Sequence, residues 1–398
     1  MEIKISHDEE NKLRQQLETR HDPEAERMKR FLAMPDLTRT ANSPIHEIVK
    51  RILAMPDYKD FDVIEVPEIV PMDVSFDLFD FPKDHPARSK SDTYYVDDHN
   101  ILRTHTTVMW NYYLAQDDVK KRMAEDKPVG SFSYGKVYRK DEIDRNHMNV
   151  FHQMDGWYLA PKPARPDESA RSGGDQEVIG IPELEKVLVD IAKAVFGPDV
   201  KYRFNPDTFP YTDPSLEMEI EVNGPSTGSG QARWVEVLGS GVVKGKVLEN
   251  HGVDSSKWNG WAFGFGLERL AIISMDLPDI RLLWSQDERV KKQLKLGNKF
   301  KEVSKYPPIV RDISFIVSND FIPNNYFDLI RDIGGDLVEE VQLLDKYENA
   351  EKFGSDKMSY TYRITYRSTD RTLETKEIDP VQQKVCERTK KEFDAQVR

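Results

Sequence analysis

The chain has 398 residues, of which 38% are hydrophobic and 32% charged, and it carries a formal net charge of −13 at pH 7. This composition is typical of a soluble globular protein of two or three domains, and it excludes the disordered and membrane classes, since no apolar run approaches the ~20 residues of a membrane span. The single cysteine, Cys386, excludes an intrachain disulfide and a cysteine-rich zinc site.

The N-terminal part is predicted to be helical. Residues 1–41 read as a charged helical extension without a strand, and Met1–Arg20 shows the pattern of neither a signal peptide nor an arginine-rich transit peptide. Ile45–Leu53 has helical spacing. Phe61–Ile69 is predicted to be a strand that Pro67 interrupts, which suits an edge position or the end of a strand.

The middle of the chain combines one helix with long strands. Pro161–Gly180 is rich in proline, serine, glycine and charge, which predicts a mobile insertion. Leu184–Val195 is an amphipathic helix that ends at Gly197, while Leu216–Val222 and Trp234–Leu238 are strands. Long strands with few crossover helices favour a mainly antiparallel sheet with helices packed on it.

A second unit begins near Tyr306. The elements predicted there are a strand Ile309–Val317, a helix Asn325–Ile333, strands Val338–Tyr347 and Ser359–Tyr366, a helix Ile378–Lys391 and a short end Phe393–Val397. This β-α-β-β-α-β order is the ferredoxin-like pattern. The lysines between residues 291 and 305 form either a solvated helix face or a basic linker.

Two arginines stand in motifs that suit an anionic substrate. Arg139 lies in the segment Gly135–Asp144, and Arg269 lies in Ala262–Leu270. A guanidinium is permanently charged and forks two hydrogen bonds onto phosphate oxygens, so two of them can hold a nucleotide from opposite sides. The Gly-x-Gly-x-Glu-Arg order places Arg269 at a helix start, where anions are favoured. Taken singly, each arginine is as often part of a structural ion pair as it is a contact to a ligand.

Two other nucleotide motifs fail in this sequence. The glycines at 264 and 266 suggest a dinucleotide fingerprint, but Arg269 occupies the third glycine position. Gly239–Lys246 is similar to a phosphate-binding loop, but Ser240 occupies the first glycine position and Val247 replaces the magnesium-binding hydroxyl. The paired arginines therefore indicate a different kind of nucleotide site.

The order of the motifs resembles the three-motif succession of class II aminoacyl-tRNA synthetases. Their details resemble phenylalanyl-tRNA synthetase, above all its single-chain, mitochondrial-type form. The resemblance runs from about residue 84 to the C-terminus through Asp84–Arg88, Leu102–Thr106, Phe151–Gln153, Phe209–Ser215, Trp234–Gly239, Pro278–Arg281 and Tyr362–Arg367.

The resemblance implies an α+β protein in which an antiparallel class II sheet with flanking helices precedes a ferredoxin-like α+β domain. The expected domains are the extension (1–41), the catalytic domain (42–290), a lysine-rich linker (291–305) and an anticodon-binding domain (306–398).

The implied reaction joins L-phenylalanine to ATP and then to tRNA(Phe). The carboxylate of phenylalanine attacks the α-phosphate, pyrophosphate leaves, and the phenylalanyl-adenylate acylates the tRNA. A carboxylate is already a nucleophile, so catalysis is expected from alignment and charge neutralisation by Arg139 and Arg269. The expected ATP-binding residues are Arg139, Asn146, His147, Met148, Glu236 and Arg269, with Mg²⁺ held at Glu236.

The resemblance also assigns an amino-acid pocket. The residues expected there are His105, Thr106, Thr107, His147, Gln153, Asp155, Phe209, Tyr211, Ala262 and Phe263, with the rings of Phe209 and Phe263 stacking on the substrate. Two positions depart from the family pattern. Asp155 stands where glutamate is usual, and Tyr211 where phenylalanine is common.

The expected partners are tRNA(Phe), with Arg363 and Arg367 as candidate contacts, phenylalanine and ATP, but no membrane. A chain that carries its own anticodon-binding domain is expected to work as a monomer without a β-subunit. Its location would be the cytoplasm of a bacterium or, alternatively, the mitochondrial matrix after removal of a transit peptide. Two alternatives remain at this point: a tRNA-binding paralogue that has lost catalysis, and a class II synthetase for another amino acid.

Overall fold

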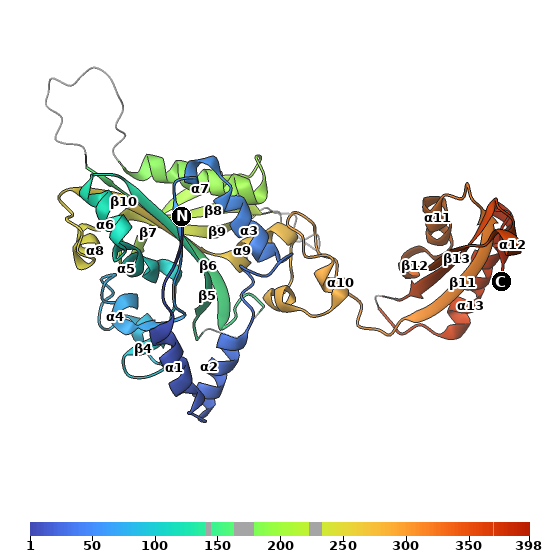
Figure 1. The fold of residues 1–398 in the computed structure, drawn as a ribbon, viewed down its shortest axis with the longest axis horizontal. Coiled ribbons are helices and arrows are strands. Elements are labelled where there is room, and N and C mark those ends of the chain that lie inside the picture. Colours follow the sequence, from blue (N-terminus) through green and yellow to red (C-terminus); the bar gives the residue numbers. More distant parts are fainter. Residues whose placement is uncertain (141–144, 163–178, 223–232, 369) are drawn as a thin grey trace, which may run out of the picture. The chain divides into compact units, whose positions relative to one another are not determined.

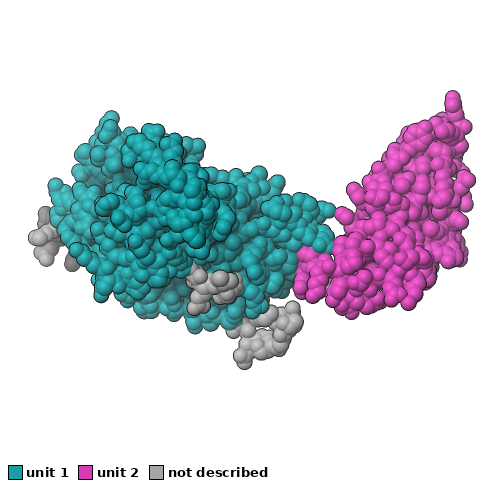
Figure 2. Space-filling view, turned by 90° about the horizontal axis from the view of Figure 1, so that it is seen from below, with its two compact units in different colours: residues 1–300 teal, residues 301–398 magenta. Residues whose placement is uncertain are grey.

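The structure is a computed structural model that describes residues 1–140, 145–162, 179–222, 233–368 and 370–398. The chain divides into two compact units, residues 1–300 and 301–398, which are coloured separately in Figure 2. Most of the predicted insertion Pro161–Gly180 lies outside the described residues. None of the helices in the described ranges is long and apolar enough to cross a membrane.

The first unit is built on an eight-stranded sheet (Figure 1). In spatial order its strands are β1 (Glu2–Lys4), β2 (Asp62–Glu65), β5 (Val129–Tyr138), β6 (Val150–Pro161), β10 (Trp258–Gly266), β9 (Arg233–Val243), β8 (Thr212–Val222) and β7 (Tyr202–Phe209). Only β1–β2 and β2–β5 pair in parallel. The remaining pairs are antiparallel, which confirms the predicted sheet type.

One prediction for the N-terminal part is wrong and another is confirmed in part. Residues 1–41 do contain a strand, because β1 extends the edge of the sheet beside β2. The predicted strand Phe61–Ile69 is interrupted at Pro67 as expected, but its two parts belong to different sheets, since β2 ends at Glu65 and β3 (Ile69–Pro71) pairs with β4 (Asn100–Leu102). Pro67 stands between them, and proline cannot donate a hydrogen bond to a strand ladder.

Helices cover the sheet on both faces (Figure 1). The helices of this unit are α1 (Asp8–Glu18), α2 (Pro23–Ala33), α3 (Pro44–Leu53), α4 (Met72–Ser75), α5 (Met109–Leu114), α6 (Asp117–Ala124), α7 (Ile181–Phe196), α8 (Gly245–Asn250), α9 (Leu267–Met275) and α10 (Glu288–Lys291). On one face α3 packs against α7 and α9, which contact β9 and β6 respectively. On the other face, the α5 residue Trp110 stacks on Trp157 of β6 with ring centroids 4.4 Å apart.

The second unit has the predicted β-α-β-β-α-β order. Its elements are β11 (Ile309–Ser318), α11 (Pro323–Gly334), β12 (Val338–Glu348), the short helix α12 (Ala350–Phe353), β13 (Lys357–Tyr366), α13 (Thr375–Glu392) and β14 (Gln396–Val397). The sheet order β12-β13-β11-β14 is antiparallel throughout. Phe315, Tyr326 and Tyr362 lie at the centre of its core. The ferredoxin-like prediction is confirmed.

Helix α3 gives a direct test of the packing under the sheet. Ile52 is fully buried on this helix, so Ile52→Ala should leave a cavity and lower the free energy of unfolding of the first unit by about 2–5 kcal/mol. Lys50→Ala, at an exposed position of the same helix, should change it by less than about 0.5 kcal/mol. Chemical denaturation followed by tryptophan fluorescence measures both values. Equal effects of the two substitutions would contradict this packing.

Candidate active site

A cavity of about 450 Å³ opens on the α5 face of the sheet in the first unit. It joins predicted site residues that are far apart in the sequence: His105, Thr107, Arg139, Asn146, His147, Met148, Gln153, Asp155, Phe209, Tyr211, Glu236, Ala262, Phe263 and Arg269. Thr106 is fully buried and is not among the lining residues. The volume is in the range of sites for small organic ligands.

The pairing of β6 with β10 forms the floor of this cavity. Side chains alternate along a strand, so Gln153, Asp155 and Trp157 share one face of β6. Gly264 lies directly opposite Asp155. A Cβ atom at Gly264 would be 2.4 Å from the Asp155 Oδ1 atom, so only glycine leaves room for the carboxylate there.

Asp155 is a buried acid at the base of the cavity. Its side chain is 4% exposed, and the Thr107 hydroxyl donates a hydrogen bond of 2.5 Å to its Oδ2 atom. Burial raises the pKa of Asp155 to about 6, although this hydrogen bond and the charge of Arg139 act in the opposite direction. Asp155 therefore changes charge near neutral pH when the cavity is empty.

Two further acceptor atoms lie in the cavity wall. His105 donates from Nε2 to the Ser75 carbonyl oxygen at 2.9 Å, and burial lowers its pKa to about 4, so the ring is neutral and Nδ1 carries a lone pair. Among the described residues, neither His105 Nδ1 nor Gln153 Oε1 has a hydrogen-bond partner. Buried acceptors without partners are costly, and a ligand that carries N–H donors would satisfy both of them.

The two predicted arginines line the same cavity. Arg139 follows β5 directly, donates from Nε to the Thr104 carbonyl oxygen at 2.9 Å, and lies over the Phe151 ring at 5.3 Å. Arg269 is the third residue of α9, and its side chain is 49% exposed. Its Nη1 atom lies 3.3 Å from the carboxylate of Glu236 on β9.

Phe209 lies in the aromatic wall of the cavity, whereas the ring of Phe263 packs on the other face of its strand. Phe209 and Tyr211 stack with centroids 6.1 Å apart and both line the cavity. The ring of Phe263 instead packs against Trp261 and Phe265 on the opposite face of β10 from Ala262 and Gly264. The predicted stacking of Phe263 on a substrate ring is therefore wrong, and this residue contributes to the wall only at the level of the strand.

Twelve lining residues were not predicted, and Trp110 and Phe81 are the two that add aromatic side chains from outside the sheet strands. Trp110 follows His105 by five positions, and its indole Nε1 has no partner within the described part of the chain. Phe81 comes from the segment between α4 and β4. No sequence pattern indicates either residue as part of the site.

The two predicted tRNA contacts lie in the second unit, and both are engaged in ion pairs. Arg363 is 43% exposed and makes two 2.8 Å hydrogen bonds to Asp312. Arg367 is only 13% exposed and bonds to Glu339 at 2.9 Å and to the Tyr306 carbonyl oxygen. Arg363 is therefore accessible to a large partner, whereas Arg367 mainly fixes the start of its own unit.

Comparisons with known families agree with this architecture. The family described as "tRNA synthetases class II core domain (F)" matches residues 30–168 and 172–294. The "Ferredoxin-fold anticodon binding domain" matches residues 304–398. The sheet, the paired arginines and these matches together define a class II aminoacyl-tRNA synthetase, which is a ligase that uses ATP as a substrate.

Curated relatives make the assignment more specific. The chain is 39% identical over 333 residues to the chloroplastic/mitochondrial phenylalanine–tRNA ligase of Arabidopsis thaliana, covering 83% of this chain and 71% of that protein. It is 37% identical over 350 residues to the mitochondrial phenylalanine–tRNA ligase of Mus musculus, with 81% and 72% covered. An α-subunit of this ligase from Caldicellulosiruptor saccharolyticus is 33% identical over 240 residues, with 59% and 63% covered. The chain therefore belongs to the phenylalanine–tRNA ligase family, as its motifs predicted.

The contact between Gly264 and Asp155 predicts a specific binding defect. Gly264→Ala should push the Asp155 carboxylate out of position and raise the KM for phenylalanine in ATP–pyrophosphate exchange by roughly 10- to 100-fold, the worth of one hydrogen bond to a charged group. Gly130→Ala is a matched control, because its Cβ atom would meet the Phe61 ring at 2.8 Å, away from the cavity. The control should lower stability without changing this KM. An unchanged KM in Gly264→Ala would contradict the proposed fit.

Proposed function

We propose that this ligase binds L-phenylalanine by its ammonium group at the cavity base and holds the triphosphate of ATP between Arg139 and Arg269. The observation that carries the proposal is that three buried acceptors and two guanidinium groups face one cavity. An amino acid and a triphosphate placed together need this combination of acceptors at one end and cations at the other.

The ammonium group would be held by His105 Nδ1, Gln153 Oε1 and the Asp155 carboxylate. An ammonium group has three N–H donors, and these atoms supply acceptors for them. The neutral state of His105 supports this role, because a protonated ring would repel the ligand. The hydrogen bond from Thr107 orients the Asp155 carboxylate. Because aspartate is shorter than glutamate, this carboxylate stays close to the strand backbone, where Gly264 leaves room for it.

The aromatic ring of the substrate would lie against Phe209, Tyr211 and Ala262. Such a wall selects by shape and by leaving a substrate hydroxyl without a partner. Arg139 would bind the α-phosphate and Arg269 the more distant phosphates. The carboxylate of phenylalanine then needs only alignment and neutralised charge to attack phosphorus. In this view Asn146, His147 and Met148 border the nucleotide.

Mg²⁺ fits this site as a partner of the nucleotide. The described residues contain no cluster of three or more side chains that could hold a metal by themselves. Glu236 is 46% exposed in the cavity wall, and Mg²⁺ is commonly bound through one or two carboxylates together with substrate phosphates. We propose that Glu236 would hold it, and that the ion when bound neutralises phosphate charge.

The second unit is proposed to contact tRNA(Phe), and Arg363 is the more accessible candidate for this contact. Residues 291–305 would link a catalytic domain that starts near residue 42 to the anticodon-binding domain 306–398. The presence of both parts in one chain supports a monomer that needs no β-subunit. The organelle-located relatives support the mitochondrial matrix rather than a bacterial cytoplasm as the location. Size-exclusion chromatography of the active chain would test its state as a monomer.

Replacing Arg139 tests the proposed mechanism. Arg139→Ala should lower kcat for ATP–pyrophosphate exchange by roughly 10²–10³-fold, because one charged contact to the reacting phosphate is lost. Arg139→Lys keeps the charge but not the fork, so its activity should lie between those of Arg139→Ala and the wild type. The purified chain should charge tRNA(Phe) without a second subunit. Exchange near the wild-type level in Arg139→Ala would remove this arginine from the mechanism.

The buried acid predicts a pH dependence of amino-acid binding. Below its pKa of about 6, Asp155 is mostly protonated in the empty cavity, and binding of the ammonium group must expel that proton. The KM for phenylalanine should therefore rise by about tenfold for each pH unit below 6 and be nearly constant from pH 7 to 8. His105, with its pKa of about 4, should add little in this range.

Exchange assays between pH 5 and 8 measure this dependence. Asp155→Asn serves as the control, since it should bind phenylalanine more weakly and without the pH effect. A KM that is equally flat in both proteins would show that Asp155 does not meet the ammonium group.

A further inference from the structure

His152 lies next to the active site without facing it. It is fully buried on β6 directly before Gln153, so its side chain points to the opposite face of the sheet from Gln153 and Asp155. There it stacks on Trp284 with centroids 5.3 Å apart. His152 is thus joined through one peptide bond to a residue proposed to bind the substrate.

The carboxylate of Glu268 accepts the hydrogen bond that a neighbouring strand would otherwise accept from the His152 backbone. β10 ends opposite Gln153, because the chain turns into α9 after Gly266, and the His152 backbone N–H has no strand partner on that side. Glu268 accepts this N–H at 3.0 and 2.8 Å through its two oxygens, and it is 3% exposed. Its neighbour in α9 is Arg269.

The His152 ring adds a second bond to the same carboxylate. Its Nδ1 atom lies 2.6 Å from Glu268 Oε1, while the backbone N–H of Leu37 donates to Nε2 at 2.9 Å. Because Nε2 uses its lone pair to accept that bond, the ring proton must be on Nδ1. Asp36, whose nearest oxygen is 3.4 Å from Nε2, accepts its hydrogen bonds from Thr38 and Arg39 instead.

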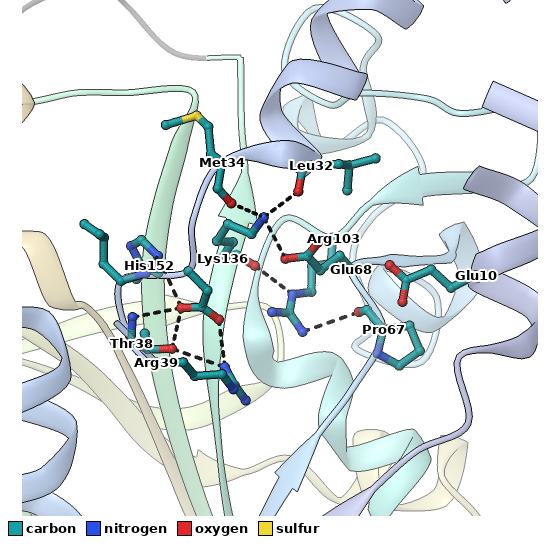
Figure 3. A network of polar contacts seen from close by, with 12 residues as sticks. Glu10, Leu32, Met34, Thr38, Arg39, Pro67, Glu68, Arg103, Lys136 and His152 are labelled. Atoms are coloured by element: carbon teal, nitrogen blue, oxygen red, sulfur yellow. Dashed lines mark hydrogen bonds and ion pairs between the residues drawn. The ribbon is translucent and has the colours of Figure 1, made fainter. Parts of the chain in front are cut away.

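The segment that contains Leu37 is fixed on this face of the sheet by Lys136, which contacts Leu32 and Met34 (Figure 3). The Lys136 ammonium of β5 donates to the Leu32 and Met34 carbonyl oxygens at 2.9 and 2.8 Å, and it pairs with Glu68 at 3.2 Å. The N-terminal segment therefore reaches the two central strands, β5 through Lys136 and β6 through His152.

We propose that His152 is a positioning residue for adenylate formation. Leu37 holds it in its Nδ1–H form, and in that form it fixes Glu268. Glu268 in turn fixes the start of α9, which carries Arg269, and the part of β6 that carries Gln153. This inference rests on the proposed roles of Arg269 and Gln153. It also gives the segment around residues 32–37 a role in catalysis, because its backbone selects the tautomer that can bond to Glu268.

Two amide substitutions separate positioning from simple packing. The amide nitrogen of His152→Asn can reach Glu268 in place of Nδ1 and needs no tautomer, whereas His152→Gln places its amide near the former Nε2 and loses the bond to Glu268. Both leave a similar gap and should lower the melting temperature to a similar extent. His152→Gln should lower kcat of ATP–pyrophosphate exchange by roughly 10- to 100-fold, since a displacement of about 1 Å in a reacting group costs up to 10²-fold.

In His152→Asn, kcat should stay close to that of the wild type. The KM for ATP should change little in either variant, because the Arg269 guanidinium still reaches the phosphates even where it is misaligned. Tyr113→Phe is the matched stability control. It removes a buried 2.7 Å hydrogen bond to Asp62, and because neither residue lines the cavity it should lower stability without changing kcat. If both His152 variants fail to fold, Glu268→Gln, which has the same shape but only one accepting oxygen, should lower kcat and the melting temperature together, whereas Tyr113→Phe lowers the melting temperature alone.

Equal kcat values in the Asn and Gln variants, or wild-type kcat in Glu268→Gln, would overturn the inference and leave His152 as a packing residue. Arg269→Ala, assayed in parallel, separates this failure from that of the proposed function. An inactive Arg269→Ala beside a fully active His152→Gln rejects only the positioning role, whereas an active Arg269→Ala rejects the proposed phosphate contact.

Discussion

The antiparallel pairing of β6 with β10 is the constraint on which the catalytic unit depends. This register sets Gly264 against Asp155 and Ala262 against Trp157, so that one face of two neighbouring strands becomes the cavity floor. The same register sends His152 and Phe263 to the other face, where they are buried. A slip by one residue would exchange the two faces and bury the acceptors in the core.

Charge is arranged on both sides of this floor in different ways. In the cavity the polar groups are incompletely satisfied, as shown by His105 Nδ1 and Gln153 Oε1. At the end of β10 the buried Glu268, which also lines the cavity, accepts both from the backbone and from the imidazole of His152. A polar network in which every group has a partner is rigid, whereas acceptors without partners at a cavity can bind the donors of a ligand. The two networks are adjacent along one strand, so the rigid one can hold the other in place.

Much of the fold followed from the sequence because its signals are periodic and local. The alternation in Leu216–Val222 gave β8, and the C-terminal order of strands and helices gave the ferredoxin-like unit. By contrast, β1 has only three residues, two of them charged, and it exists because β2 offers an edge to pair with. Such a strand has no pattern of its own.

The sequence was enough to predict which residues gather at the candidate site, but not which way their side chains point. Ala262 and Phe263 are neighbours on one strand, so only one of them can face the cavity, and the sequence alone does not tell which. The links from Leu37 to His152 and from His152 to Glu268 each join residues more than a hundred positions apart, and no motif announces them. The prediction of residues 1–41 as an extension also missed this link, and the class II family match already begins at residue 30.

The glycines of the floor limit how this enzyme can diversify. A methyl group at Gly156 would come within 2.5 Å of the Phe263 ring, and one at Gly239 within 2.9 Å of the Phe209 ring. A larger residue at either glycine would therefore displace an aromatic ring beside the cavity. New amino-acid preferences, whether natural or engineered, should arise by exchanges at other lining positions.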